Sequence, residues 1–313
     1  MGRSRHRMPQ ETYKTGEQES AASWGSNRDN NAEIVDSYAT GNVDGGGSVG
    51  GLVGQNAGSI TASHATGDVT ASGSSGGLFG TNFGGFIDKS YATGDVWAED
   101  GTAGGFGGNH RDHGVVQSSY ATGEVTGGES SNDLGGLLGS TTWAEVRESY
   151  ATGSVEGGDF VGGLIGYAWG AIVENCYSLS SVMGANRVGG LIGWRGYDEW
   201  DHDQGSIVNS YAAGTITATG DYVGGLIGDY YFETPQELTE AFWDKATTGI
   251  DSDSDAVGNI AGIGGATGLN TSEFDEQSTF DNGAGWDFDS IWQMGTSPAP
   301  DGEERPVLKW QLE

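Results

Sequence analysis

The chain has little of several residue types on which common protein classes depend. Its 313 residues include one cysteine and five prolines. The single cysteine, Cys176, excludes an intramolecular disulfide, so no disulfide framework holds the fold together. Lys and Arg number 13 against 44 Asp and Glu, which gives a formal net charge of −31. Because phosphate groups are bound by Lys and Arg, this shortage of cations disfavours nucleic acids and anionic membranes as partners.

Long apolar runs are also missing. No stretch approaches the ~20 apolar residues of a membrane-spanning helix, so we expect no transmembrane segment. The first ten residues, MGRSRHRMPQ, are basic, but no apolar stretch follows them, so they are not a signal peptide as written. One expectation is therefore that the N-terminus is truncated and that a secretion signal lies upstream.

The excess of acidic residues makes self-repulsion a cost of folding, and salt relieves it because the screening length falls to ~3 Å at 1 M. The acid-rich, lysine-poor composition resembles that of proteins from extreme halophiles, so we expect a halophilic protein. The alternative is an acidic secreted protein without adaptation to salt.

Glycine is abundant, with 59 residues, and many of these glycines recur in a two-part repeat. The first part has an aromatic residue after a small one, as in SYATG, and begins at Ser37, Ser63, Ser90, Ser119, Ser149, Cys176 and Ser210. The second part is a glycine box such as GGLIG, and begins at Gly50, Gly76, Gly104, Gly135, Gly162, Gly189 and Gly224. The aromatic residues of successive repeats are 26, 27, 29, 30, 27 and 34 positions apart.

A repeat of this length has room for two or three short strands, and its Val, Ile, Tyr and Thr favour extended backbone. One repeat cannot bury an apolar face alone, whereas stacked repeats can. We therefore predict an all-β protein, a parallel β-solenoid (β-helix) of about seven coils over residues 34–231. A degenerate coil is expected within residues 1–33, and a mixed capping segment over residues 232–313.

Equivalent positions of the repeat predict the interior. The residues on either side of the aromatic are small, and side chains alternate between the faces of a strand. We expect the small residues inside and the aromatic ring outside. The predicted core comprises two columns, one of valines from Val43 to Ile216 and one of mostly leucines from Leu52 to Leu226. The box glycines require either positive φ at corners or close approach between backbones, and the sequence leaves both open.

The glycine box that follows SYATG resembles the GLUG repeat, a family of bacterial and archaeal surface and adhesin-like proteins. The resemblance covers about residues 34–231 in seven copies. It implies an extracellular or cell-surface location and a non-catalytic structural or adhesive role. Two copies depart from the pattern, with CYSLSS at Cys176 and Gly107 at an apolar box position, so we expect local irregularity there.

The N-terminal stretch TYKTG, from Thr12, matches SYATG in part. The later Gly25 aligns with Gly54 of the first box, but the interval is shorter and Lys14 replaces a small residue. We interpret residues 11–33 as a degenerate coil. It is either a polar cap on the first strand edge or the remainder of a longer repeat array.

One insertion in the sixth repeat is the main candidate for ligand binding. The stretch WRGYDEWDHDQG combines aromatic rings, which stack on sugars, with carboxylates, which accept hydrogen bonds from hydroxyl groups. The predicted site comprises Trp194, Tyr197, Asp198, Glu199, Trp200, Asp201 and Asp203, with a cell-surface glycan or a protein as partner. A structural loop is the alternative.

Metal sites are suggested only weakly. Asp251, Asp253 and Asp255 alternate as in the first half of an EF-hand loop, but Ala256 and Gly262 stand where that loop has Gly and Glu. No cofactor is expected, apart from calcium at these three residues as an alternative. The pair His110 and His113 is interpreted as part of a solvated turn.

An enzyme is the rival interpretation, because many β-helices cleave polysaccharides. Such enzymes need clustered carboxylates, and no repeat carries a distinctive catalytic cluster. Beyond the repeats, TPQELTEAF and NTSEFDEQSTF have the capping pattern of short helices, and RPVLKWQLE is predicted as a last strand. We expect this C-terminal segment to cap the solenoid. The oligomeric state is left open.

Overall fold

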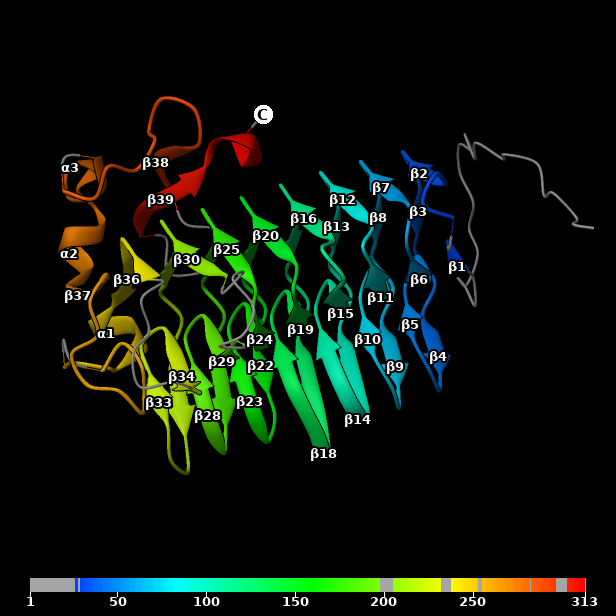
Figure 1. Cartoon of the computed structure of the whole chain (residues 1–313), viewed down its shortest axis with the longest axis horizontal. Helices are drawn as coiled ribbons and strands as arrows, with labels where there is room; N and C mark the ends of the chain where they lie inside the picture. Colours follow the sequence, from blue (N-terminus) through cyan, green and yellow to red (C-terminus); the bar gives the residue numbers. More distant parts are fainter. Residues whose placement is uncertain are drawn as a thin grey trace, which may run out of the picture.

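A computed structural model describes residues 26–27, 29–197, 205–231, 238–252, 255–281, 283–296 and 303–312. Strands stack coil upon coil into a parallel β-solenoid of about eight turns, as Figure 1 shows. The predicted all-β solenoid is confirmed. We number coils 1 to 7 by the SYATG-type motifs and name four sheets after what they carry.

The box sheet contains the strands that follow the glycine boxes. It comprises β1 (Ser26–Asn27), β6 (Val53–Asn56), β11 (Phe79–Phe83), β15 (Gly107–Arg111), β19 (Leu138–Thr142), β24 (Ile165–Trp169), β29 (Ile192–Gly196) and β34 (Ile227–Tyr230). The corner sheet precedes the SYATG motifs. It comprises β2 (Glu33–Val35), β7 (Ser59–Thr61), β12 (Phe86–Asp88), β16 (Val115–Gln117), β20 (Glu145–Arg147), β25 (Ile172–Glu174), β30 (Ser206–Val208) and β35 (Leu238–Thr239).

The tyrosine sheet carries the aromatic residues of the motif. It comprises β3 (Tyr38–Ala39), β8 (His64–Ala65), β13 (Tyr91–Ala92), β17 (Tyr120–Ala121), β21 (Tyr150–Ala151), β26 (Tyr177–Ser178), β31 (Tyr211–Ala212), β36 (Ala241–Asp244) and β37 (Ala266–Leu269).

The valine sheet carries the valine column. It comprises β4 (Val43–Gly45), β5 (Val49–Gly50), β9 (Val69–Ala71), β10 (Ser75–Gly76), β14 (Val96–Gly104), β18 (Val125–Gly135), β22 (Val155–Glu156), β23 (Asp159–Gly162), β27 (Val182–Gly184), β28 (Asn186–Gly189), β32 (Ile216–Ala218) and β33 (Val223–Gly224).

A left-handed residue turns the chain from the corner sheet into the tyrosine sheet in every coil. These residues have φ between 44° and 54°, and they are Asp36, Ala62, Lys89, Ser118, Glu148, Asn175, Asn209 and Glu240. The next residue explains why the motif begins with serine. The Ser119 hydroxyl donates to the carbonyl of Gln117 across the corner, and it accepts a hydrogen bond from the backbone N–H of Ser90 in the coil before. The column of small residues is therefore a hydrogen-bonded ladder.

The interior matches the predicted columns. Ala65, Ala92 and Ala121 are fully buried with the leucine column in one core, and the valine column forms a second core. The box glycines are explained by close approach between coils. A Cβ at Gly50 would overlap backbone atoms of Val53 and Phe79, and Gly50 is not among the glycines with positive φ. Close packing of backbones, and not corner geometry, is the reason for this glycine.

The two departures from the motif do not distort the coils, so the predicted irregularity is wrong. Gly107 lies in register between Phe79 and Leu138, and a side chain there would overlap the ring of Phe79. The larger Phe79 of one coil thus fills the space that Gly107 leaves in the next. Tyr177 and Ser178 of CYSLSS pair in register with the coils on both sides.

The aromatic rings of the motif point away from the interior core and stack on one another. Tyr91 and Tyr120 have centroids 5.0 Å apart with 10° between the planes, and His64 stacks between Tyr38 and Tyr91. From coil 5 onward the C-terminal segment covers this tyrosine ladder. Tyr150, Tyr177 and Tyr211 are buried in a third core, with partners that include Phe274, Phe280, Trp286, Trp292 and Leu308.

The C-terminal segment comprises α1 (Lys245–Thr248), α2 (Thr271–Phe274), α3 (Gln277–Asp281), the antiparallel pair β38 (Trp292–Thr296) and β39 (Glu304–Leu308), and the 3₁₀ turn η1 (Lys309–Leu312). Figure 1 shows it at the C-terminal end, folded back along the upper edge of the solenoid. A buried ion pair joins it to the last coil, since Arg305 lies 3.0 Å from the carboxylate of Asp244.

The capping patterns have different outcomes. NTSEF is helical, and the Glu273 carboxylate accepts from the Asn270 backbone N–H as the pattern predicts. RPVLKWQLE contains the predicted strand β39. The helix expected from TPQELTEAF is wrong where the structure describes that stretch, because Leu238–Thr239 and Ala241–Asp244 are strands that continue the solenoid. Stacking on coil 7 decides the conformation there, whereas residues 232–237 lie outside the described residues.

At the N-terminal end, β1 pairs with β6 so that Ser26 and Asn27 lie opposite Gln55 and Asn56. TYKTG and Gly25 themselves lie outside the described residues. The Asn27 side chain donates to Asn56, which donates in turn to Asn82, so an asparagine ladder begins in this strand.

Candidate functional site

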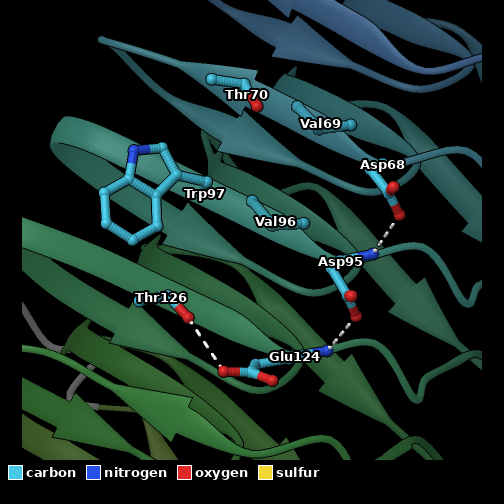
Figure 2. Close-up of a pocket in the computed structure, with 8 residues that line it drawn as sticks. All are labelled: Asp68, Val69, Thr70, Asp95, Val96, Trp97, Glu124 and Thr126. Atoms are coloured by element: carbon cyan, nitrogen blue, oxygen red, sulfur yellow. Dashed lines mark hydrogen bonds between the residues drawn. The ribbon is translucent and has the colours of Figure 1, made fainter.

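A groove crosses the valine sheet of coils 2 to 4, with a volume of about 300 Å³. It is lined by Asp68, Val69, Thr70, Asp95, Val96, Trp97, Glu124 and Thr126. Figure 2 shows the three acidic side chains in a row along one side and the Trp97 indole on the other. Equivalent residues of three neighbouring coils therefore build one surface.

The row of acidic side chains is a hydrogen-bonded ladder. The Asp68 carboxylate accepts from the backbone N–H of Asp95 at 3.1 Å, and the Asp95 carboxylate accepts from that of Glu124 at 2.9 Å. Asn42 begins the ladder, since its side-chain oxygen accepts from the backbone N–H of Asp68. Asp68 and Asp95 thus each close the turn of the next coil, whereas Glu124 accepts from the Thr126 hydroxyl of its own coil. These hydrogen bonds offset part of the repulsion between neighbouring carboxylates.

Trp97 is the one aromatic residue of the groove. Thr70 and Thr126 lie opposite it in the adjacent coils, and the rest of this outward-facing column varies, with Asp44, Glu156, Met183 and Thr217. The indole is 46% exposed, and no other ring stacks on it within the described part of the chain. An exposed tryptophan costs the fold hydrophobic burial, so the sheet does not require it.

This combination fits a sugar better than a metal. An indole face packs on the C–H groups of a pyranose ring, and carboxylates and hydroxyls exchange hydrogen bonds with sugar hydroxyls. Within the described ranges, no three His, Cys, Asp or Glu side chains gather as metal ligands. The groove is therefore suited to an uncharged polar ligand.

A second cluster, which we call the aromatic patch, lies on coils 5 to 7 and comprises Phe160, Tyr167, Trp169, Trp194 and Tyr231. The Trp194 indole stacks on Tyr167 and Trp169, with centroid distances of 4.7 and 5.8 Å and 8° between the planes in both pairs. Tyr231, which is 62% exposed, is inclined by 49° to Trp169. Phe160 meets Trp194 edge to face.

Charged groups adjoin the aromatic patch. Arg187 lies over the Phe160 ring at 5.0 Å and forms ion pairs with Asp159 at 3.3 Å and Asp229 at 2.9 Å. The carboxyl of Asp133 lies near Tyr167, and burial raises the pKa of Asp133 to about 6 while a hydrogen bond from Thr102 opposes that rise. Phe160 and Arg187 both have φ of +55°, a conformation that costs bulky residues energy.

The predicted ligand residues fall in different places. Trp194 belongs to the aromatic patch. Tyr197 is only 8% exposed and packs in the interior core against Tyr230, so its ring presents no face to a ligand. Asp198, Glu199, Trp200, Asp201 and Asp203 lie outside the described residues. Asp251 and Asp255 are exposed, and Asp253 lies outside the described residues, so the ligand and calcium sites stay predictions.

Trp97 and the partners of Trp194 were not predicted from the sequence. For the partners of Trp194 the signal was a break in their column, with Tyr167 and Trp194 after polar residues, whereas the column of Trp97 varies from coil to coil and carries no such break. The predicted solvated turn at His110 is wrong. His110 is fully buried, with its Nδ1 accepting from Asn82 and its Nε2 donating to the carbonyl of Glu145, whereas His113 is exposed.

Comparison with known proteins supports the repeat assignment. The GLUG motif matches at three places, residues 45–70, 161–183 and 184–217, which confirms the resemblance seen in the sequence. A relative from Evansella cellulosilytica, named "Putative Gly-rich membrane protein", is 37% identical over 111 residues, which make up 35% of this chain and 12% of that protein. This chain thus spans a small part of the relative's length. No solved structure matches the chain.

Across the described ranges, none of the helices combines the length and the apolar character needed to cross a bilayer.

Proposed function

We propose that this chain, with its GLUG repeats, is a non-catalytic, extracellular or cell-surface rod that holds a glycan-binding groove. The repeats support the rod, since every coil pairs with its neighbours in register. The relative's name supports a surface location. The groove supports binding, because the fold itself has no use for an exposed indole beside a row of carboxylates.

The single observation that carries the binding role is Trp97. Thr70 and Thr126 occupy the same place in the coils before and after, so a threonine satisfies the sheet at this position. The indole therefore adds a surface that the solenoid does not need. The Asp95 carboxylate accepts from the backbone N–H of Glu124, and the Glu124 carboxylate accepts from the Thr126 hydroxyl, so both acceptors are held in place beside the indole.

Binding is tested by affinity electrophoresis through gels that contain neutral or acidic polysaccharides. We expect the wild type to be retarded by a neutral polysaccharide, and Trp97→Thr to lose most of that retardation. Phe86→Thr is the matched control, since Phe86 is an aromatic of similar exposure, 40%, on the corner sheet. If both variants migrate like the wild type in every gel, the groove does not bind glycans.

The rival function is a polysaccharide-active enzyme, and Asp133 is the observation that favours it. A carboxyl with a pKa of about 6 can hold a proton for a leaving group. A screen for released reducing ends or unsaturated products on acidic and neutral polysaccharides separates the two functions. Turnover that Asp133→Asn abolishes would replace the binding function by catalysis.

A calcium-stabilised scaffold is the second alternative, and it rests on the alternating Asp251, Asp253 and Asp255. Isothermal titration with calcium, comparing the wild type with Asp253→Ala, tests it directly. Heat release that only the wild type shows would establish calcium as a ligand of this segment.

A further inference from the structure

The aromatic patch breaks the pattern of one column of the repeat. Along the box sheet one column reads Gln55, Thr81, Asn109, Ser140, Tyr167, Trp194 and Asp229. Coils 1 to 4 thus place small or polar side chains where coils 5 and 6 place large rings. The solenoid continues in register through both halves, so the rings are not required for coil stacking.

The surrounding chain is adapted to hold these rings. Gly196 lies opposite Trp169, and a Cβ at Gly196 would lie 2.5 Å from the Trp194 indole. Its lack of a side chain leaves space for Trp194 to lie across both Tyr167 and Trp169. Phe160 contributes its ring from a left-handed position that Asp133, Arg187 and Tyr222 share in the neighbouring coils, and this ring meets both Tyr167 and Trp194 edge to face. The missing side chain of Gly196 and the ring of Phe160 therefore both support the patch.

The charges beside the patch indicate what it would bind. The guanidinium of Arg187 is already paired with both Asp159 and Asp229, so it has little positive potential to offer an anion. These three groups together carry one negative charge, and the whole chain carries −31. An anionic polymer would be repelled. An uncharged chain that offers C–H faces to the rings and hydroxyl groups to the carboxylates is complementary to this surface.

We propose that the aromatic patch is a second glycan site, that it takes an uncharged polysaccharide, and that the rod therefore binds two sugar chains at once. Only the bivalence of the rod rests on the proposed function, because it requires the groove as the other site. The aromatic patch depends on its own residues and not on the groove. Trp97 belongs to coil 3 and Trp194 to coil 6, so the sites are separated by ~14 Å along the rod at ~4.8 Å per coil. They also lie on different sheets, so one sugar ring cannot contact both.

The two sites are distinguished by titrating the protein with neutral hexasaccharides, namely cellohexaose, xylohexaose and chitohexaose. Hexagalacturonate is the anionic comparator. We expect two neutral hexasaccharides per wild-type chain and one for Trp194→Ser. Tyr231→Ala, at the most exposed ring of the patch, provides a second variant if Trp194→Ser does not fold. It should bind the second hexasaccharide about tenfold more weakly. Circular dichroism establishes which variants are folded.

Trp97→Thr makes the two sites distinguishable. A loss of one site in Trp97→Thr and of the other in Trp194→Ser supports both sites. If only Trp194→Ser loses a bound hexasaccharide, the patch is supported and the groove is rejected. If only Trp97→Thr loses one, the groove is supported and the patch is rejected. A patch that prefers hexagalacturonate, or no loss of binding in Trp194→Ser and Tyr231→Ala, overturns the inference. Cross-linking of soluble neutral polymer by the wild type, but by neither single variant, would establish bivalence.

Discussion

Most box glycines lie where the backbone of an adjacent coil passes close by, whereas Gly107 and Gly225 face the rings of Phe79 and Trp243. These neighbours fix what each position tolerates. At Gly77 a Cβ would overlap the carbonyl oxygen of Gly105 and lie 2.7 Å from the Cβ of Ala92. Backbone atoms of a β-ladder cannot move aside without breaking hydrogen bonds to both neighbouring coils. Gly47, in contrast, has no atom within 4 Å of a Cβ.

We predict that Gly77→Ala lowers the free energy of unfolding by ~3 kcal/mol, because overpacking a rigid site displaces backbone. Gly47→Ala should change it by less than ~0.5 kcal/mol, as is usual for an unconstrained surface position. Urea denaturation of the two variants and the wild type measures this. Equal midpoints for both variants would show that the coils adjust to a side chain in the box.

His110 ends the asparagine ladder with a titratable group that is buried in its neutral form. Burial lowers its pKa from 6.5 to about 4, although the hydrogen bond to the carbonyl of Glu145 opposes the change. Protonation would also place a hydrogen on Nδ1, which accepts from Asn82. Because the folded pKa lies below the unfolded one, the unfolded state binds more protons between pH 6.5 and 4.

We therefore predict that His110 contributes full stability above pH 6.5, and that this contribution falls by ~3 kcal/mol as the pH drops to 4. His110→Asn, which extends the asparagine ladder, should remove this part of the pH dependence. His113→Asn, at the exposed histidine three residues away, should leave it unchanged. Melting temperatures between pH 7 and 4 test this, and parallel curves for His110→Asn and the wild type would contradict it.

At the scale of elements, the carboxylates of the acidic ladder in coils 2 to 4 repel one another and also accept hydrogen bonds. Carboxylates in register, ~4.8 Å apart, repel by roughly 1 kcal/mol per neighbour in water. The same carboxylates accept the backbone N–H groups of the next coil. Asn42 shows that an amide can take this place, since it accepts from the backbone of Asp68 and donates to its carboxylate.

Asp95→Asn should consequently remove the charge and keep the hydrogen bond. We predict a higher melting temperature than the wild type in low salt and a smaller rise between low and molar salt. Asp44→Asn is the control, because Asp44 is an exposed acid of coil 1 outside the ladder. Identical salt slopes for Asp95→Asn and the wild type would mean that this ladder does not carry the salt dependence.

The elements differ in how far the sequence predicted them. The serine, alanine, valine and leucine columns were predictable because each is repeated seven times and depends only on the adjacent coils. β35 and β36 were not, because Leu238 and Phe242 pair with coil 7 although their sequence has lost the motif. The groove escaped prediction, and only Trp194 of the aromatic patch was predicted, since both surfaces depend on which single residues come together in space.

At the scale of the whole molecule, the tyrosine ladder runs through all seven coils, but its cover does not. Trp310 lies 6.2 Å from Tyr120 and 5.9 Å from Tyr150, at the edge of the covered region. The residue after the motif alanine changes one coil after the cover begins. It is threonine in coils 1 to 5, as at Thr93, but Leu179 and Ala213, both buried, in coils 6 and 7. The loss of the motif threonine in coils 6 and 7 was thus a sequence signal that these coils are covered, and the repeat pattern alone did not account for it.

We predict that deleting residues 284–313 destabilises only the covered coils, because stability in a solenoid is a sum over neighbouring units. In hydrogen exchange, amides of β26 and β31 should lose protection, whereas those of β8 and β13 should keep it. Leu312→Ser, at a residue that is 67% exposed, should change neither set. Uniform loss of protection along the chain would show that the cover is essential for the whole fold.

The left-handed corner has a consequence for engineering. Eight different coils hold the same backbone turn with Asp, Ala, Lys, Ser, Glu, Asn, Asn and Glu. The backbone there is set by the pairing of the flanking strands with the adjacent coils, and at seven of the eight corners also by the Ser or Cys that follows, and not by the identity of the corner residue itself. At the three exposed corners in succession, Asp36, Ala62 and Lys89, a designer could therefore choose the side chain and obtain a line of functional groups at ~4.8 Å intervals. The backbone of the corner would then fix the spacing of these groups, whatever their chemistry.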